Sequence, residues 1–467
     1  MTRIASQPAL SDLPGRCPRL SLPDLTTLAL GIALTVGFQG YQFGQSNHAV
    51  YLPPALHQFD PSLLRNDWFT TATLQYHTLF TTFSAALMRF HIIQPAFFIS
   101  YFALVVLFHL AWLRLTWLLG GSRQTYALSV GLYYLSGAGL GLGMYQFLQD
   151  SAFLPSNIAN VAMLWGVCFL AASRPLAAAS TLGLASLFHL NHAVVAPLLW
   201  GFRFLLPPRA WRDKGGVFFG VPLFPSLLLL GVCAVAVGPI LPRILARPQP
   251  IAFQEFIDLY VRLRHPHHYD PSSWPWYLWV AFLWPMPLAM GVYRRCPAVF
   301  RCGLFFACLQ LLALLFAGLF YVSESVVQLS LYRFSIYVKL LSCIAAGYVI
   351  WDRFLLPRGR HPWLAQGLPA SLLVFCMGIL VFRQTWPMDL WPIPRDDKDY
   401  RALCQWARRH TPVDALFLVP PDEQSFRLHG QRAIVVNFKG VPQLSSELPE
   451  WRRRLESVLG MENLLDL

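Results

Sequence analysis

The sequence predicts an all-α polytopic membrane protein with a small α/β domain at its C-terminal end. Three observations predict this fold class. The 467 residues are 55% hydrophobic and 15% aromatic, with a mean hydropathy of +0.46, which is far above the values of soluble domains. Apolar runs of about 20 residues, long enough to cross a hydrocarbon core of about 30 Å, recur along the chain. The density of charged residues rises after residue 383.

Eleven apolar runs are expected to span the membrane. A polar leader, residues 1–23, precedes the first run and is expected in the cytoplasm; because no small-residue cleavage site follows, the first span is predicted to be retained. The pattern over 175–206 fits either a tight hairpin with FHLNH at its tip or one long span with a re-entrant piece. The predicted spans of this transmembrane domain, 24–383, are 24–40, 93–113, 125–143, 156–173, 175–188, 193–206, 216–240, 275–293, 303–321, 333–351 and 364–382.

Basic residues are unequally divided between alternate loops. With the N-terminus in the cytoplasm, the inner segments hold sixteen Lys and Arg residues and the outer loops hold seven. The positive-inside rule therefore predicts a cytoplasmic N-terminus and an extracytoplasmic C-terminus. The net charge of +13 is thus accounted for by membrane orientation, and no nucleic-acid partner is expected.

Two outer loops are long enough to carry function, 41–92 and 241–274. The second half of the first, NDWFTTATLQYHTLFTTFSAALMRF, begins with an Asn/Asp cap and is amphipathic, which predicts a helix lying at the membrane interface. Residues 384–467 are expected to form a small soluble α/β domain outside the cytoplasm. In it, DYRALCQWARRHTP predicts a helix ended by a Thr-Pro turn, and ALFLVPP and RAIVVNF predict short buried strands.

Cysteine and histidine spacings indicate no metal centre. None of the nine cysteines forms a Cys-x-x-Cys pair, so neither a zinc site nor a disulfide framework is predicted. His189 and His192, and the HPHH stretch at 265–268, have the right ligand types without a diagnostic spacing, and hydrogen-bonded structural histidines are the alternative. No metal ligand and no cofactor are assigned, although a divalent metal ion is compatible with these side chains.

The ionisable residues of the outer loops are expected to surround one outward-facing cavity. Asp67 is the first candidate for a general base, and a helix-capping role fits it equally. Asp60, before Pro61, is expected more as a turn residue; Asp150 is either a functional acid or a helix-end aspartate. Arg333 suits a lipid phosphate, with snorkelling to headgroups as the alternative. The expected substrate-binding residues are Asn47, His48, Tyr76, His77, Arg264, His265, His267, His268, Tyr269 and Arg333.

Together these features resemble the C-type (GT-C) membrane glycosyltransferases. NDWFTTATLQYHTLF is similar to the Asp…His-Pro-Pro segment of their protein O-mannosyltransferase branch, with Thr78 in place of the first proline. Over nearly its full length the chain also resembles a group of uncharacterised bacterial membrane proteins. They share YLPPALHQFDPSLLRNDWF, RHPHHYDPSSW and a tail like TPVDALFLVPPDEQSFRLHGQRAIVVNFKG.

The glycosyltransferase resemblance implies a GT-C-like fold in a bacterial inner membrane. It implies a polyprenyl-phosphate-linked sugar as donor, an acceptor at the outer leaflet, a carboxylate as base and cations on the donor phosphate. The mannosyltransferases carry an acidic pair after the first span, where this chain has Gln45, Asn47 and His48, so the base would be Asp67, Asp60, Asp150 or His48.

Two other functions fit a polar cavity in a membrane protein. A transporter or flippase would carry the substrate through, but such proteins tend to show repeat symmetry and interrupted helices near the midplane, whereas no repeat is visible in this sequence. A non-catalytic scaffold would tolerate replacement of its outer polar residues. The expected partners are the lipid-linked sugar, its acceptor and membrane lipids.

Overall fold

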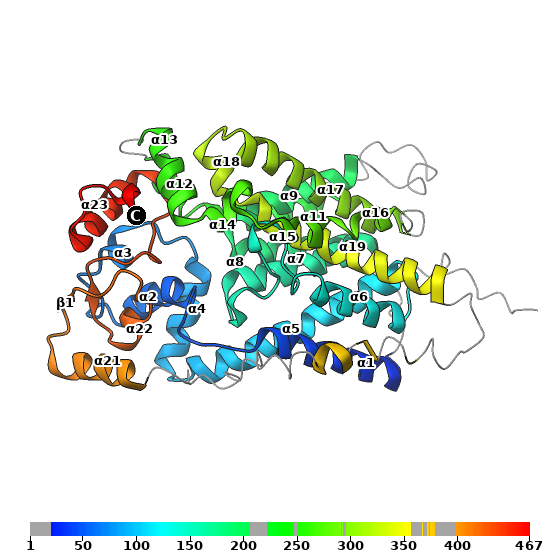
Figure 1. The fold of residues 1–467 in the computed structure, drawn as a ribbon, viewed down its shortest axis with the longest axis horizontal. Helices are drawn as coiled ribbons and strands as arrows, with labels where there is room; N and C mark the ends of the chain where they lie inside the picture. The colour runs from blue at the N-terminus through cyan, green and yellow to red at the C-terminus, as the bar shows by residue number, and fades with distance from the viewer. Residues whose placement is uncertain are drawn as a thin grey trace, which may run out of the picture.

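The computed structural model describes residues 20–205, 222–246, 251–290, 292, 296–355, 367, 371–372, 374–378 and 398–467. This part of the chain is mostly helical. Its helices form a bundle, shown on the right of Figure 1, and the C-terminal residues lie at the left end of the bundle beside α2, α3 and α4. The predicted helical class is therefore confirmed.

Four described segments are long and apolar enough to cross a membrane. A fifth span results if the bent pair Leu142–Ser151 and Pro155–Ala171, which meet at 106°, is counted as one. Several apolar helices could thus span a membrane, as the composition predicts. The four segments are α1 (Leu22–Gln39), α5 (Ile93–Leu118), Pro297–Leu319 with α17 (Pro297–Leu314), and Glu324–Val349 with α19 (Ser335–Val349).

Several expected spans correspond to shorter helices. α6 (Arg123–Leu135), α8 (Pro175–Phe188) and α11 (Leu223–Val237) have 13, 14 and 15 residues. At about 1.5 Å per residue these helices reach roughly 20–22 Å, which is less than the hydrocarbon core of about 30 Å. The eleventh expected span, 364–382, lies largely outside the described residues. The number of eleven spans is therefore not established.

Helices α7 (Pro155–Ala171), α8 and α9 (Leu190–Leu205) are consecutive and pack against one another. The break between α8 and α9 falls at His189, whose backbone is extended with φ −146° and ψ 122°. This arrangement agrees with the hairpin alternative for 175–206. The eighth expected span is interrupted in a similar way, because Pro285 follows the end of α15 (Trp276–Leu283) and precedes α16 (Met286–Ala289).

The first long loop was expected to form one interfacial helix. The structure has two separate helices there, so the prediction of one continuous helix was wrong. α3 (Trp68–Ala72) ends before an extended stretch, and α4 (Thr78–Arg89) begins after it. α4 has one buried face, since Phe80, Ser84 and Met88 are buried at helical spacing. α2 (His48–Phe59) precedes both helices and packs against α4.

The C-terminal residues contain the predicted helix, α21 (Lys398–His410). The two predicted strands are present as a parallel pair, but each has only two residues, and β1 is partly exposed where a buried strand was predicted. The α/β character is therefore minimal. The elements after α21 are β1 (Leu416–Phe417), α22 (Phe426–His429), β2 (Ala433–Ile434) and α23 (Leu448–Leu459).

The C-terminal residues and the fourth loop share one hydrophobic core. Trp451 and Leu455 of α23 are fully buried and cluster with Phe256 and Val261 of the loop. The polar connections therefore form one packed layer at the end of the bundle. The remaining short helices of the described residues are η2 (Leu142–Met144), η3 (Gln149–Ser151), α12 (Leu241–Leu245), α13 (Phe253–Phe256), η4 (Ile257–Arg264), α14 (Pro266–Tyr269), η5 (Pro271–Ser273), η6 (Leu315–Leu319), α18 (Glu324–Gln328), η7 (Leu331–Phe334), η8 (Ile350–Leu355), η10 (Ser445–Glu447) and η11 (Leu464–Asp466).

Candidate functional site

Asp67 is a fully buried carboxylate that joins the first loop to the C-terminal residues. One oxygen accepts from the backbone N–H and the hydroxyl of Thr70 at 2.9 and 2.8 Å, which caps α3. The other accepts from Arg427 Nε at 2.7 Å and from the Ile434 N–H at 3.1 Å. Two hydrogen bonds to each oxygen occupy the acceptor sites of a carboxylate. This geometry matches the capping alternative and leaves no free acceptor for a reacting hydroxyl.

Two other candidates also have structural partners. Asp60 forms a turn in which one oxygen accepts from the N–H and the hydroxyl of Ser62 at 2.9 and 2.7 Å, and these bonds lower the pKa of Asp60. His48 is buried: its Nδ1 accepts from the Gly44 N–H at 3.0 Å and its Nε2–H donates to the Phe153 carbonyl at 3.0 Å. Burial lowers the pKa of His48 to about 4. Neither side chain is poised for catalysis.

Asp150 is the half-buried carboxylate of this layer. Its Oδ2 accepts from Ser46 Oγ at 2.9 Å and from the Asn47 N–H at 3.2 Å. Its Oδ1 receives one long contact of 3.4 Å from Gln149 Nε2. The backbone of Asp150 has a φ of 58°, a conformation that costs a non-glycine residue about 1 kcal/mol or more. Surrounding contacts hold this carboxylate in a strained position with acceptor capacity left.

His77 from the first loop and His189 and His192 from the α8–α9 junction form a cluster. Their neighbouring ring centroids lie 5.2 and 5.3 Å apart. His77 Nδ1–H donates to the Phe188 carbonyl at 3.1 Å. Four other ring nitrogens of the cluster are buried without a hydrogen-bond partner among the described residues: Nε2 of His77, Nδ1 of His189, and both nitrogens of His192. Each unsatisfied buried group costs about 1–3 kcal/mol, and these nitrogens have hydrogen-bonding capacity that a polar ligand could use.

Arg333 lies next to the histidine cluster. It belongs to η7, and the following residue, Phe334, packs 5.1 Å from the His192 ring. The guanidinium carbon lies 4.5 Å from the centroid of the Tyr145 ring, and Arg333 Nε is buried without a partner in the described part of the chain. Tyr145 in turn stacks on His268 with centroids 4.4 Å apart. Arg333 therefore stands between the histidine cluster and the fourth loop.

The RLRHPHHYD stretch lies between η2 and the C-terminal residues. His268 Nδ1–H donates to the Gly143 carbonyl at 2.7 Å, and His265 Nδ1–H donates to the Tyr260 carbonyl at 3.0 Å. Tyr269 shares a 2.6 Å hydrogen bond with Ser330 Oγ, and Arg264 Nε donates to the Phe438 carbonyl at 2.7 Å. Burial lowers the pKa of His265 and of His268 well below 6.5, so these rings are neutral at pH 7. The ring of His267 is tilted against that of His268, with centroids 4.1 Å apart, and His267 is partly buried.

A metal ion has no evident site in this layer. No group of three or more His, Cys, Asp or Glu side chains in the described residues could hold one. His265 and His268 of the fourth loop donate to backbone carbonyls instead.

Arg264, Arg333 and Lys439 form no ion pair with a carboxylate of the described residues. The ion pairs formed within the described ranges involve Arg262, Arg427, Arg452, Arg453 and Arg454, and none includes Arg264, Arg333 or Lys439. Lys439 was not anticipated from the sequence. Its signal was its rarity: in a chain dominated by arginine, lysine occurs only at positions 214, 339, 398 and 439.

Tyr51 and Tyr76 complete the surroundings of His77. Their ring centroids lie 4.6 and 4.1 Å from that of His77. Burial raises the pKa of Tyr51 to about 12, Arg333 lowers it and Asp150 raises it. The charges of Arg333 and Asp150 both act on the Tyr51 hydroxyl, so Tyr51 lies near both side chains. The structure brings together eight residues named from the sequence: Asp150, Asn47, Tyr76, His77, Arg264, His268, Tyr269 and Arg333.

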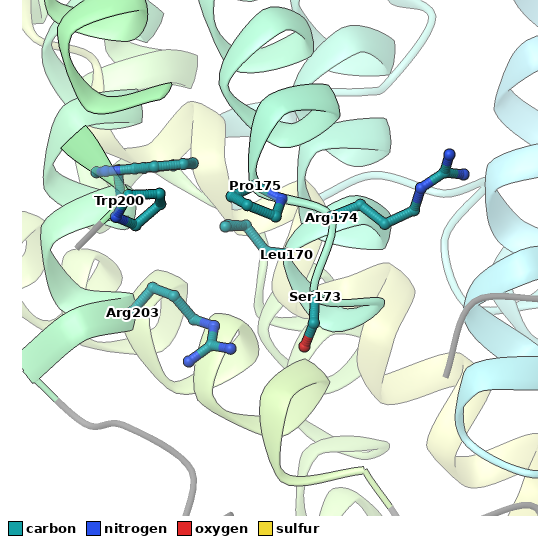
Figure 2. Close-up of a pocket in the computed structure, with 7 residues that line it drawn as sticks. Leu170, Ser173, Arg174, Pro175, Trp200 and Arg203 are labelled. Atoms are coloured by element: carbon teal, nitrogen blue, oxygen red, sulfur yellow. The ribbon is translucent and has the colours of Figure 1, made fainter. Parts of the chain in front are cut away.

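A small pocket lies at the opposite end of the helices, between the α7–α8 connection and the end of α9. It has about 260 Å³ of empty space and is lined by apolar side chains with Ser173, Arg174 and Arg203. Figure 2 shows Arg203 and Ser173 directed toward the same space, whereas Arg174 extends away from it. None of the predicted site residues lines this pocket. It belongs to the end that the positive-inside rule predicts to be cytoplasmic.

A comparison with known protein families gives a match. A family described as a domain of unknown function (DUF6798) matches residues 398–458, the segment that includes Arg427 and Lys439. No protein of curated function matches the chain. The match covers a minor part of the sequence and carries no activity with it.

Proposed function

We propose that this protein is a membrane glycosyltransferase of GT-C-like fold that uses a polyprenyl-phosphate-linked sugar at the outer leaflet. The observation that carries the proposal is the grouping of Arg333 with three buried histidines, in which four ring nitrogens and Arg333 Nε have no hydrogen-bond partner among the described residues. An anion with hydroxyl groups nearby would satisfy these atoms.

The donor phosphate would bind Arg333 and Arg264. Neither forms an ion pair with a described carboxylate, and guanidinium groups bind phosphate oxygens with charge-assisted hydrogen bonds. Trp276 and Tyr277, exposed by 75% and 57% at the start of α15, suit the aromatic belt at a membrane–water interface. A lipid phosphate at that level is within the same layer as Arg333.

The sugar would lie against His77 and its aromatic neighbours. Because His77 Nδ1–H donates to the Phe188 carbonyl, Nε2 of the neutral ring is an acceptor. Burial lowers the pKa of His77 to about 3, so the neutral form is present at pH 7. A sugar hydroxyl can donate to this nitrogen, and the rings of Tyr51 and Tyr76 offer apolar faces beside it.

Asp150 is the candidate base, because Asp67 and Asp60 are committed to structural hydrogen bonds. In the proposed step, the acceptor hydroxyl oxygen bonds to the anomeric carbon while the bond from that carbon to the phosphate oxygen breaks. The hydroxyl proton passes to Asp150, and polyprenyl phosphate leaves while bound to Arg333. The donors Ser46 Oγ and Asn47 N–H hold the Asp150 carboxylate through Oδ2.

The proposal is tested with the purified full chain in lipid nanodiscs and radiolabelled polyprenyl-phosphate sugars. Asp150→Asn should lower transfer by about 10²–10⁴-fold, because a general base is removed, without changing donor binding. Arg333→Ala should weaken donor binding about tenfold or more. The exposed Asp414→Asn is the matched control and should behave as wild type.

Three results would count against the proposal. Full transfer by Asp150→Asn would remove Asp150 as the base. Unchanged donor binding by Arg333→Ala would remove the phosphate site. Movement of the lipid across the bilayer without sugar transfer would favour the transporter or flippase instead.

A further inference from the structure

Lys439 lies where three parts of the polar layer meet. It follows β2, in the residues that lead to α23, and its Nζ is 3.5 Å from Ser46 Oγ of the first loop. Ser46 Oγ donates to Asp150 at 2.9 Å. The carbonyl of the preceding residue, Phe438, accepts from Arg264 of the fourth loop at 2.7 Å. The lysine is therefore held beside both the candidate base and one of the unpaired arginines.

The Lys439 ammonium has hydrogen-bonding capacity to spare. An ammonium has three donors, and the contact with Ser46 is a single long one. Burial and Arg264 lower the pKa of Lys439, while Asp150 raises it. A half-buried cation with a neighbouring cation is in an environment that an anion stabilises.

A buried network holds the loop that carries Lys439 at both of its ends. Arg427 donates through Nε to Asp67 at 2.7 Å and through Nη1 to Asn437 Oδ1 at 3.0 Å. The Gly440 N–H donates to the same Asn437 oxygen at 2.9 Å. Asp67, Arg427 and Asn437 are at most 1% exposed. Asn437 and Gly440 flank Phe438 and Lys439, so this network fixes the position of the lysine.

Gly440 allows the close packing of this network. A Cβ there would lie 2.8 Å from Asn437 Oδ1 and 3.3 Å from Arg427 Nη1. A larger residue would therefore displace the amide that anchors the loop. The NFKG sequence thus combines an anchor, a cation and a close backbone approach.

We propose that Lys439 is a third ligand of the donor phosphate bound by Arg333 and Arg264, and that Asp67, Arg427 and Asn437 are positioning residues for it. The inference rests on the proposed function and deepens it. It assigns to the C-terminal residues, including those matched by the DUF6798 family, a direct part in substrate binding. It also gives Asp67 a role that does not require contact with the substrate.

The test uses the full-length protein in phosphatidylcholine nanodiscs with increasing amounts of polyprenyl phosphate. Lys439→Ala should weaken binding about tenfold to a hundredfold, as expected for one charge-assisted contact, and Lys439→Arg should restore part of the affinity. Lys398→Ala, an exposed lysine in the same segment, is the matched control. Arg333→Ala is measured in parallel because it tests the proposed function.

Amine acetylation read by mass spectrometry gives a second measurement that does not depend on a variant. Bound polyprenyl phosphate should slow the acetylation of Lys439 and leave that of Lys398 unchanged.

Asn437→Ala, which removes the anchor for Arg427 and the Gly440 N–H, should speed acetylation of Lys439 in the empty protein and weaken binding as Lys439→Ala does. A merely structural role of Asn437 would lower stability without changing this reactivity.

The outcomes separate the inference from the proposed function. Wild-type affinity in Lys439→Ala, with binding lost in Arg333→Ala, would overturn the inference and leave the proposed function standing. Absence of binding and of Lys439 protection in the wild type would overturn both. Equal protection by phosphatidylglycerol without polyprenyl phosphate would mean a general lipid-headgroup site and would also overturn the assignment.

Discussion

At the residue scale, Glu447 shows how tertiary contacts set the chemistry of a single side chain. One of its carboxylate oxygens accepts from the Leu74 N–H at 3.0 Å, and the other is buried without a partner in the described part of the chain. Burial raises the pKa of Glu447 to about 7, against the opposing effects of the Leu74 hydrogen bond and Arg243. The carboxyl group therefore titrates near neutral pH at the contact between the first loop and the C-terminal residues.

This pKa predicts a pH dependence of stability. Between pH 4.5, the ordinary pKa of Glu, and about 7, the folded state keeps a proton that the unfolded state has released, so stability falls as pH rises through this window. Glu447→Gln keeps the acceptor for Leu74 and removes the charge. We expect it to raise the unfolding temperature at pH 8 and to flatten the dependence between pH 5 and 8, measured by thermal unfolding in detergent.

Glu450 provides the contrasting control. Hydrogen bonds from Arg453 and Arg454 lower its pKa to about 2. Glu450→Gln should therefore give no stabilisation at pH 8. Identical unfolding temperatures of wild type and Glu447→Gln across this pH range would refute the assignment for Glu447.

The three aspartates also show what residue type alone leaves open. Asp67, Asp60 and Asp150 have the same chemistry, and the sequence supports a capping role for Asp67 because Asn66-Asp67 precedes α3. Its partner Arg427, however, is 360 positions away. No local pattern predicts that pair. Only the fold shows that Asp67 is fully hydrogen-bonded whereas Asp150 keeps acceptor capacity.

At the element scale, helix contacts depend on small residues. Gly347 in α19 faces α6, where an added Cβ would lie 2.9 Å from the Thr125 carbonyl oxygen and 3.1 Å from the Ser129 nitrogen. Both are backbone atoms that cannot move without shifting the helix. Close approach of helices through small residues is typical of membrane bundles.

Gly347→Ala is therefore expected to destabilise the protein by about 1–3 kcal/mol through overpacking. Gly303→Ala in α17 is the matched control, because its Cβ would make an ordinary contact of 3.5 Å with Leu341. Alanine there should be neutral or slightly stabilising, since it has a higher helix propensity than glycine. Unfolding midpoints of the two variants check the difference, and equal midpoints would contradict it.

The first long loop shows why element boundaries were harder to predict than element types. An amphipathic pattern predicted one helix, but the chain breaks between α3 and α4. Thr73 Oγ1 and Gln75 Nε2 both donate to the Phe69 carbonyl, and the Leu74 N–H donates to Glu447. A partner from the far end of the chain replaces the hydrogen bonds that a continuous helix would make.

At the scale of the whole molecule, α2, α3, α4, α12, α13 and the C-terminal elements lie together at one end of the helix bundle (Figure 1). Contacts such as those of Arg264 with Phe438 and of His77 with Phe188 tie distant segments into this layer. The opposite end carries the arginine-lined pocket. The two ends of the helices therefore differ in the side chains that they carry.

Cysteine labelling tests which face that is. In a background without the nine native cysteines, the exposed positions Ser272→Cys and Gln424→Cys should react with an impermeant maleimide added from outside the cytoplasm. Ser173→Cys, exposed at the other end, should react only after the membrane is permeabilised. The reverse pattern would invert the predicted orientation.

By itself, the sequence determined that the chain is helical and rich in apolar helices that could span a membrane. It also determined that ionisable residues concentrate in alternate loops. These are properties of composition and local periodicity. Only the tertiary structure decided that Asp67 is paired with Arg427, that Lys439 joins the polar layer and that four described segments are long enough to be spans. Those outcomes depend on burial and on contacts between residues far apart in the chain, which no local pattern encodes.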